Sequence, residues 1–188
     1  MISLVNGMLL YHGSYAEVSD INLEKCSKGK DFGQGFYVTS SKEQAIKFIQ
    51  LSCKRQIRFG NIPENTKGGY VSVYKLHVKE KLSIEVFEGA DQNWLHFVAA
   101  NRDDKLFQKM IERYKNVDII GGKIADDRTA RTLLSYLDGL YGKPGTEQAD
   151  QFAIQLHLPN RLEDQYCFRT KSAISALEFV GSEYYAYQ

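Results

Sequence analysis

Two short stretches of the chain, residues 10–14 (LYHGS) and residues 31–39 (DFGQGFYVT), decide its interpretation. The first predicts a strand over residues 8–11 that ends at a turn, and this turn carries His12 beside a glycine that allows close backbone approach. In the second, two glycines precede an aromatic pair, so the backbone can bend and present Tyr37 to a cleft. Either stretch alone favours a hairpin loop whose tyrosine is simply packed, whereas the two together favour a ligand site.

The segment that follows the second stretch predicts an amphipathic helix. Ser41 followed by Gln44 is a capping-box pattern, and the helix that it opens is expected to run to about residue 59. Four residues are expected on its inner face, namely Ala45, Phe48, Ile49 and Cys53. The two stretches are therefore followed by a helix that can pack on a sheet.

Strands and helices are mixed in the rest of the chain. Strands are expected over residues 70–78, 82–87, 117–120 and 165–169, with a last strand through residue 180. One helix is expected after a cap at residue 91, and it carries Trp94, Phe97 and Val98. Further helices are expected over residues 103–114, 128–140, 146–156 and 171–176. A Gly-Gly turn is expected directly after the strand at residues 117–120. Because regular β-α-β alternation is missing, an α+β fold is favoured over a doubly wound sheet.

Length and composition limit the classes of protein and of partner. The chain has 188 residues, and its glycine-rich breaks at residues 60–69 and 139–145 are only of loop length, so a single domain over residues 1–188 is expected. The formal net charge of +1 removes the simplest argument for generic binding to nucleic acid or anionic membranes, although it is compatible with a local basic face. The 12 Tyr and 10 Phe indicate either core packing or a surface on which a planar ligand stacks.

The cysteines and the N-terminal stretch bear on compartment and cofactor. Cys26, Cys53 and Cys167 are far apart, and neither a C-x-x-C pair nor a histidine at metal-ligand spacing is present, so no disulfide framework and no metal site is expected. The N-terminal stretch lacks the basic start of a signal peptide, and no apolar run approaches the roughly 18 residues of a membrane span. The expectation is a cytoplasmic protein without a membrane partner, although a protein exported by a non-classical secretion system would look the same.

The two stretches resemble the ADP-ribosyltransferase superfamily, on the branch that is named for its His-Tyr-Glu triad and includes diphtheria toxin and the poly-ADP-ribose polymerases. In that branch a strand ends in Tyr/Trp-His-Gly-Ser/Thr, and a Gly-x-Gly-hydrophobic-Tyr segment leads into a helix that opens with small polar residues and alanine. The matching residues here are Tyr11, His12, Gly13, Ser14, Gly33, Gln34, Gly35, Phe36 and Tyr37, followed by residues 41–45.

Nearly the whole chain more closely resembles the DUF3990 family, a bacterial family of uncharacterised proteins assigned to that superfamily. The shared features are LYHGS, DFGQGFYVT, the Asn101-Arg102 pair, residues 118–127 (DIIGGKIADD) and residues 165–170 (QYCFRT). The resemblance implies an ADP-ribosyltransferase-like split β-sheet with flanking helices. It also implies a cleft that binds NAD as co-substrate.

The resemblance gives each of the matching residues a role toward NAD. His12 would hydrogen-bond a ribose hydroxyl of the adenosine half, and the Gly13 backbone would hold the nicotinamide amide through an N–H and C=O pair. Tyr37 would stack on the nicotinamide ring, with either Tyr70 or Phe36 on its other face. The full set implied for binding NAD is His12, Gly13, Ser14, Gly35, Phe36, Tyr37 and Arg102.

Arg102 and its neighbour Asn101 admit two interpretations. Such a pair often stands at the end of a helix, where its side chains cap the last carbonyl groups. Alternatively, the Arg102 guanidinium could clamp the pyrophosphate of NAD in a bidentate manner.

The third position of the triad departs from the family pattern, because Gln165 stands where the family has glutamate. Glutamine can hydrogen-bond the ribose 2′-hydroxyl but supplies no negative charge to an oxocarbenium-like transition state, a contribution of several kcal/mol in a dry cleft. Glu163, on the same face of a strand, is the nearest candidate to supply that charge, followed by Asp126 and Asp127. The alternative for the two aspartates is an N-cap and a first-turn acid of the next helix.

These observations lead to one expected function and two alternatives. The first is mono-ADP-ribosyl transfer from NAD to a protein or nucleic-acid acceptor, with Gln165, Glu163 and Asp127 as the candidate catalytic residues. Bacterial enzymes of this size are often toxins or toxin–antitoxin effectors, so analogy at the level of the fold adds a toxin role with an antitoxin partner as an expectation. The alternatives are a catalytically weak module that binds NAD or ADP-ribose, and an NAD glycohydrolase in which water replaces the acceptor.

Overall fold

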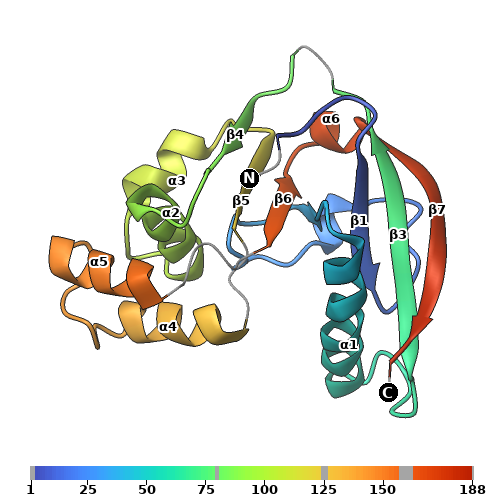
Figure 1. Ribbon diagram of the computed structural model, residues 1–188, viewed down its shortest axis with the longest axis horizontal. Coiled ribbons are helices and arrows are strands. Elements are labelled where there is room, and N and C mark those ends of the chain that lie inside the picture. The colour runs from blue at the N-terminus through green and yellow to red at the C-terminus, as the bar shows by residue number, and fades with distance from the viewer. Residues whose placement is uncertain (1–2, 79–80, 124–126, 157–162, 188) are drawn as a thin grey trace.

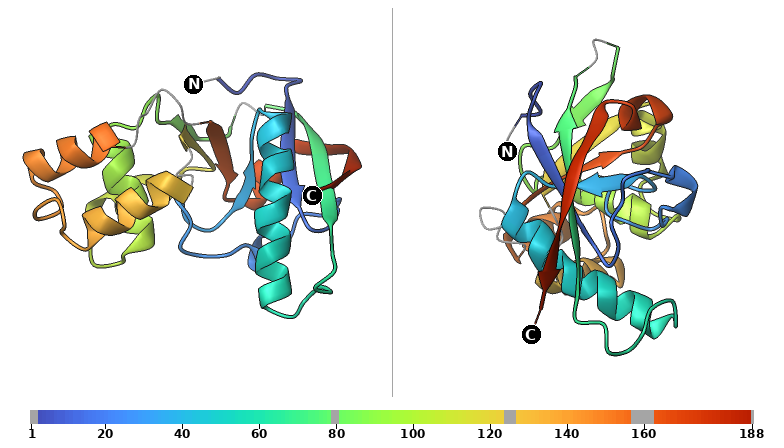
Figure 2. Two further views of the ribbon diagram at one scale, coloured as in Figure 1. Left: turned by 60° about the horizontal axis from the view of Figure 1, so that its bottom comes forward. Right: turned by 90° about the vertical axis from the view of Figure 1, so that its right-hand side faces the viewer.

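The computed structural model describes residues 3–78, 81–123, 127–156 and 163–187, with the side chains of residues 127–129 outside the description. The described residues form an α+β fold that contains two β-sheets. A three-stranded sheet stands on the right of Figure 1, a four-stranded sheet lies in the middle, and helices α2 to α5 lie on the left. Figure 2 shows the same succession of parts after a turn of the molecule.

The three-stranded sheet has the order β1-β3-β7 and is antiparallel throughout. Its strands are β1 (Leu9–Ser14), β3 (Gly68–Leu76) and β7 (Leu177–Ala186). Helix α1 (Lys42–Arg58) packs against β1 and β3 with Ala45, Ile49 and Cys53 buried. A side chain at Gly13 would place its Cβ 1.8 Å from the Ala45 carbonyl oxygen, so the close approach of helix and strand requires glycine there.

The four-stranded sheet has the order β2-β6-β5-β4 and is mixed, because β4 and β5 are parallel. Its strands are β2 (Phe36–Val38), β4 (Ile84–Val86), β5 (Ile119–Lys123) and β6 (Asp164–Phe168). Aromatic rings lie over the two glycines of β5, since a Cβ at Gly121 would come 2.9 Å from the Tyr166 ring and one at Gly122 2.5 Å from the Phe32 ring. The glycines therefore let the aromatic core approach the sheet closely.

The two sheets meet at one point and then diverge. The backbone N–H and C=O of Tyr11, in β1, each bond the backbone of Thr39, directly after β2, at 2.9 Å. Beyond this bridge β1 and β2 no longer pair, and the edge of β1 faces a split in the sheet.

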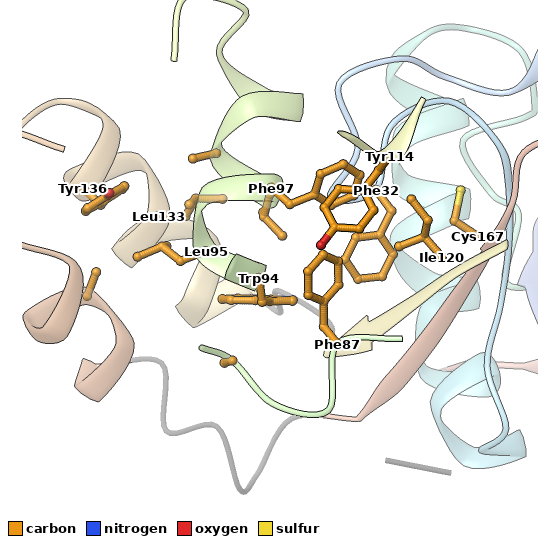
Figure 3. Close-up of a cluster of buried hydrophobic side chains, with 14 of the residues drawn as sticks. Phe32, Phe87, Trp94, Leu95, Phe97, Tyr114, Ile120, Leu133, Tyr136 and Cys167 are labelled. Carbon is orange, nitrogen blue, oxygen red and sulfur yellow. The ribbon is translucent and has the colours of Figure 1, made fainter. Parts of the chain in front are cut away.

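The helical side of the molecule consists of α2 (Gln92–Arg102), α3 (Gln108–Tyr114), α4 (Asp127–Leu137) and α5 (Glu147–Leu156). Asp91 caps α2 by accepting from the Trp94 N–H at 2.8 Å. Figure 3 shows the aromatic cluster between these helices and the four-stranded sheet, with Phe32, Phe87 and Phe97 packed against one another. Two shorter helices complete the described chain, η1 (Leu23–Lys25) and α6 (Lys171–Ile174). None of the helices in the described ranges is long and apolar enough to cross a bilayer.

A buried carboxylate ties the helices together. Asp150, only 2% exposed, accepts hydrogen bonds from Gln92 (2.7 Å), His96 (2.6 Å) and the Tyr136 hydroxyl (2.5 Å). Burial opposes ionisation of Asp150, but these hydrogen bonds outweigh it and lower the pKa of the carboxyl group. The network joins α2, α4 and α5 on the side of the molecule away from the split.

Several boundaries differ from the sequence predictions. The turn expected at His12 and Gly13 is wrong, because β3 pairs with β1 as far as Ser14. The Gly-Gly turn is also wrong, because β6 pairs with both glycines and extends β5 to Lys123. Phe48 was expected to point inward but is 42% exposed, since it lies about 100° around the helix from Ile49.

Two further elements differ only in length. The helix expected over residues 103–114 begins at Gln108, after a left-handed Phe107 (φ 49°). The last strand continues beyond residue 180 to Ala186, because β3 offers nine residues for pairing.

Candidate functional site

His12 connects the two sheets at the split. Its Nδ1 atom lies 2.7 Å from the carbonyl oxygen of Tyr37, and because a carbonyl only accepts, Nδ1 carries a proton. The half-buried ring lies 4.5 Å from the ring of Phe36. Burial lowers the pKa of His12, and the hydrogen bond to Tyr37 only partly offsets this effect. The neutral ring therefore keeps an unprotonated Nε2 atom as a hydrogen-bond acceptor.

The backbone of Gly13 points into the split. In an antiparallel ladder, the N–H and C=O groups of residues i and i+2 point to the same edge of the strand. Tyr11 directs both of its groups away from β3, to Thr39, so those of Gly13 point to the same side. At that level β2 has diverged, and the Tyr37 carbonyl that would face Gly13 in a continuous sheet bonds His12 instead. Gly13 and Ser14 are both buried, so a donor and an acceptor lie together at a sheltered edge.

Tyr37 holds the glycine-rich loop that precedes it. Its hydroxyl donates to the Gly33 carbonyl at 2.8 Å and accepts from the Phe32 N–H at 2.9 Å. The ring is half-buried and nearly parallel to that of Phe32, 6.5 Å away. Burial raises the pKa of Tyr37 well above its usual range, with a further contribution from neighbouring Cys167. The hydroxyl is thus committed to the loop, and what the residue can offer a ligand is a ring face.

Gly35 keeps this loop close to the sheet. A Cβ at Gly35 would lie 2.4 Å from the Cys167 sulfur and 2.8 Å from the Phe168 carbonyl oxygen. Cys167 is opposite Tyr37 in the β2–β6 pairing, so it shares a face of the sheet with Tyr37 and with Gln165, two residues earlier in β6. Burial raises the pKa of the Cys167 thiol to about 12, which keeps it protonated and unreactive.

Gln165 belongs to a buried network that the sequence analysis did not predict. Its Nε2 atom donates to Oδ2 of Asp31 at 3.0 Å, and both residues are less than a tenth exposed. Arg102 binds Oδ1 of the same carboxylate through Nε, at 3.2 Å, and through its terminal nitrogen. Because a carboxylate only accepts, the amide nitrogen of Gln165 must face Asp31, and the amide oxygen points elsewhere.

Among the described side chains, those of Glu163, Tyr70 and Asn101 lie outside this network. Glu163 is exposed and lies directly before β6. Asp127 is the first residue of α4, but its side chain, like all of Asp126, lies outside the described residues. Tyr70 makes an edge contact with Tyr184, 5.4 Å between ring centres, and Asn101 donates to the Phe97 carbonyl within α2 at 2.9 Å.

Asp31 is the residue that sequence reasoning missed. It opens the stretch DFGQGFYVT, where a charged group precedes a run of aromatic and small residues. A carboxylate in such surroundings needs a cation or several donors, and this requirement is the signal that could have found it. In the parts of the chain that the structure describes, His, Cys, Asp and Glu side chains nowhere form a group of three or more that could hold a metal ion.

The chain matches a known protein family. The family model described as "Protein of unknown function (DUF3990)" matches residues 8–179, which include β1, the glycine-rich loop and β6. No match was found among curated proteins.

Proposed function

The chain belongs to the DUF3990 family, and on that premise we propose that it is an NAD-dependent mono-ADP-ribosyltransferase. The observation that carries the proposal is the edge of β1 at Gly13, where an N–H and a C=O point into the split beside His12. The carboxamide of nicotinamide offers one acceptor and one donor, which complement this pair. Buried backbone groups require partners, so an amide bound here satisfies both at once.

His12 and Tyr37 would complete the binding surface from either side of the junction. With its proton on Nδ1, His12 presents Nε2 as an acceptor for a ribose hydroxyl. Tyr37 offers a ring face for stacking, because its hydroxyl is held by Phe32 and Gly33. A cationic nicotinamide ring gains a cation–π contribution on such a face, and neutral nicotinamide loses it on departure.

Gln165 and Asp31 would act on the ribose next to the bond that breaks. Cleavage of the nicotinamide–ribose bond of NAD develops positive charge on the ribose. The amide oxygen of Gln165, oriented by Asp31, would accept a hydrogen bond from the ribose 2′-hydroxyl. A glutamate oxygen has this role in the enzymes that the chain resembles. Asp31 would supply through this hydrogen bond part of the negative charge that Gln165 lacks, which is why we assign the compensating charge to Asp31 before Glu163 or Asp127.

The ion pair of Asp31 with Arg102 favours a second candidate, a module that binds NAD or ADP-ribose without turnover. Arg102 neutralises much of the buried carboxylate charge, and less of it then remains to stabilise a cationic sugar. Because the guanidinium of Arg102 is held by Asp31, it is also engaged at the position from which it would otherwise clamp a pyrophosphate. NAD glycohydrolysis is the third outcome that an assay must separate.

The test uses the purified protein with NAD labelled in the adenine half, in the presence of a cell lysate. Transfer releases nicotinamide and leaves label on protein or nucleic acid, hydrolysis releases nicotinamide without macromolecular label, and the module binds NAD without releasing nicotinamide. His12→Asn should abolish NAD binding, whereas His77→Asn, at an exposed histidine that pairs with Glu178, should not. Absence of NAD binding by the folded wild-type protein would overturn the proposal.

A toxin role adds one expectation in cells. Expression of the wild-type chain should arrest bacterial growth, and His12→Asn should relieve the arrest while the protein accumulates to the same level. Equal toxicity of the two proteins would reject this role and leave the NAD assay to decide the activity.

A further inference from the structure

Helix α1 carries a basic surface that its packing does not use. Its buried residues Ala45, Ile49 and Cys53 repeat every four positions and contact the three-stranded sheet. The opposite half of the helix is exposed and carries seven residues besides Glu43 and the C-terminal Gly60. We call this surface the α1 outer face, and it consists of Lys47, Phe48, Leu51, Lys54, Arg55, Arg58 and the C-cap Phe59.

The cations of the α1 outer face are not neutralised by the fold. In the described parts of the chain, none of Lys47, Lys54, Arg55 and Arg58 takes part in an ion pair within 4.0 Å. At about 3.6 residues per turn, Lys47, Lys54 and Arg58 line up along the helix. The formal net charge of +1 for the whole chain therefore conceals a local basic stripe.

Exposed apolar side chains lie beside this stripe. Phe59 is 66% exposed, Phe48 42% and Leu51 41%, and none of the three belongs to a hydrophobic core. They are not among the buried residues of α1 that pack on the sheet. Aromatic rings interleaved with cations are what a single strand of nucleic acid requires, because its phosphates need charge and its unpaired bases need planar surfaces.

A further cation, Lys30, stands beside the candidate site. This half-buried lysine directly precedes Asp31 in the chain. Its backbone carbonyl oxygen accepts a hydrogen bond from the Gly33 N–H at 3.0 Å. Burial lowers the pKa of Lys30, as do the positive charges of Arg55 on α1 and Arg102 at the buried network. Arg55 on α1 and Arg102 each repel the positive charge of Lys30.

We infer that the α1 outer face binds single-stranded nucleic acid, with backbone phosphates on Lys47, Lys54 and Arg58 and bases stacked on Phe48 and Phe59. A duplex would satisfy the cations but leave the phenylalanines without a partner, since its bases are already stacked. An anionic membrane needs a continuous apolar face to bury, whereas here the inner face is occupied by the sheet and the outer face alternates cations with apolar residues.

This inference also names an acceptor class for the proposed transfer. Binding of the strand does not depend on NAD, whereas its identification as the ADP-ribose acceptor rests on the proposed function. Helix α1, whose outer face would hold the strand, packs on β1 at Gly13 and so lies beside the candidate site.

The experiment measures fluorescence anisotropy of labelled RNA and DNA single strands, about 20 nucleotides long, titrated with the full chain in the absence of NAD. Affinity should fall with salt, with a slope of log K against log salt of about −2 for three phosphate contacts. Lys47→Glu/Arg58→Glu should weaken binding at least tenfold and flatten this slope. Phe48→Ala/Phe59→Ala should weaken binding at least about fivefold and leave the slope unchanged, because stacking is independent of counterion release.

Matched variants make the result decisive. Lys105→Glu/Lys109→Glu introduces the same charge change at two exposed lysines of the helical side and should bind like wild type. His12→Asn should bind the oligonucleotide normally even where it abolishes NAD binding, which separates this inference from the proposed function. The inference is overturned if neither strand binds at low salt, if both charge variants lose binding equally, or if phosphatidylserine vesicles bind the wild type and the oligonucleotides do not.

Discussion

Gln165 in β6 donates its amide N–H to the carboxylate of Asp31 at 3.0 Å, across 134 residues of sequence. The contact joins a residue of the sheet to the loop that leads into β2, and Arg102 extends it to the end of α2. A glutamine alone offers a ligand either its nitrogen or its oxygen. Asp31 removes that choice and leaves the oxygen available, which is the atom type that a glutamate would present.

Replacement of Asp31 should be costly, because it leaves a partly buried guanidinium and a buried amide without their acceptor. Asp31→Ala should lower the free energy of unfolding by about 2 to 4 kcal/mol, measured by urea denaturation at pH 7. Asp20→Ala, at an exposed carboxylate, should change it by less than about 0.5 kcal/mol. An Asp31→Ala protein as stable as the control would show that the network is not formed in solution.

The Tyr37 hydroxyl should matter for the loop separately from the ring. Tyr37→Phe keeps the ring but leaves the Phe32 N–H and the Gly33 carbonyl without a partner, at a cost of about 1 to 3 kcal/mol. NAD affinity should fall less in Tyr37→Phe than in Tyr37→Ala, since only the second variant removes the stacking surface. Tyr15→Phe, at an exposed tyrosine, serves as the stability control. Identical NAD affinities of the two Tyr37 variants would argue against stacking.

Gly13→Ala should prevent α1 from packing on β1. The new Cβ would come 1.8 Å from the Ala45 carbonyl oxygen, which belongs to the helix backbone and cannot move aside alone. We expect a loss of about 3 kcal/mol or more, or failure to fold, by thermal and urea unfolding. At Gly89 nothing lies within 4 Å of an added Cβ, so Gly89→Ala should leave the midpoints of thermal and urea unfolding nearly unchanged. A stable Gly13→Ala protein would contradict the close packing of α1 on β1.

The lowered pKa of His12 should appear in the pH dependence of stability. Because the folded protein binds the His12 proton less readily than the unfolded chain, whose pKa is near 6.5, the unfolded state binds more protons at acid pH. The contribution of His12 is therefore complete above pH 6.5 and is lost as pH falls toward the folded pKa, at up to about 1.4 kcal/mol per pH unit. Urea denaturation of wild type and His12→Asn between pH 7.5 and 5.5 should give a shallower slope for the variant. Equal slopes would mean that His12 titrates normally.

Sequence patterns predicted most of the secondary structure, because they depend on local chemistry. The capping role of Ser41, the burial of Ala45, Ile49 and Cys53, and the strands β3 and β6 follow from hydrophobic periodicity and short-range hydrogen bonds. The wrong turns at Gly13 and at Gly121–Gly122 have one cause. A glycine that permits a turn and a glycine that permits close packing in a strand look alike in sequence, and only the neighbouring element distinguishes them.

The sequence by itself determined the α+β class and the family, and it predicted a ligand site at the two stretches around His12 and Tyr37. These conclusions rest on local order and on recognisable motifs. Only the tertiary structure decided that Asp31 binds Gln165 and Arg102, that Gly13 lies at an open strand edge, and that the face of α1 with its cations stays exposed. The physical reason is that a hydrogen bond, a sheet edge and an electrostatic surface depend on distances between residues far apart in the chain, which spacing along the sequence does not contain.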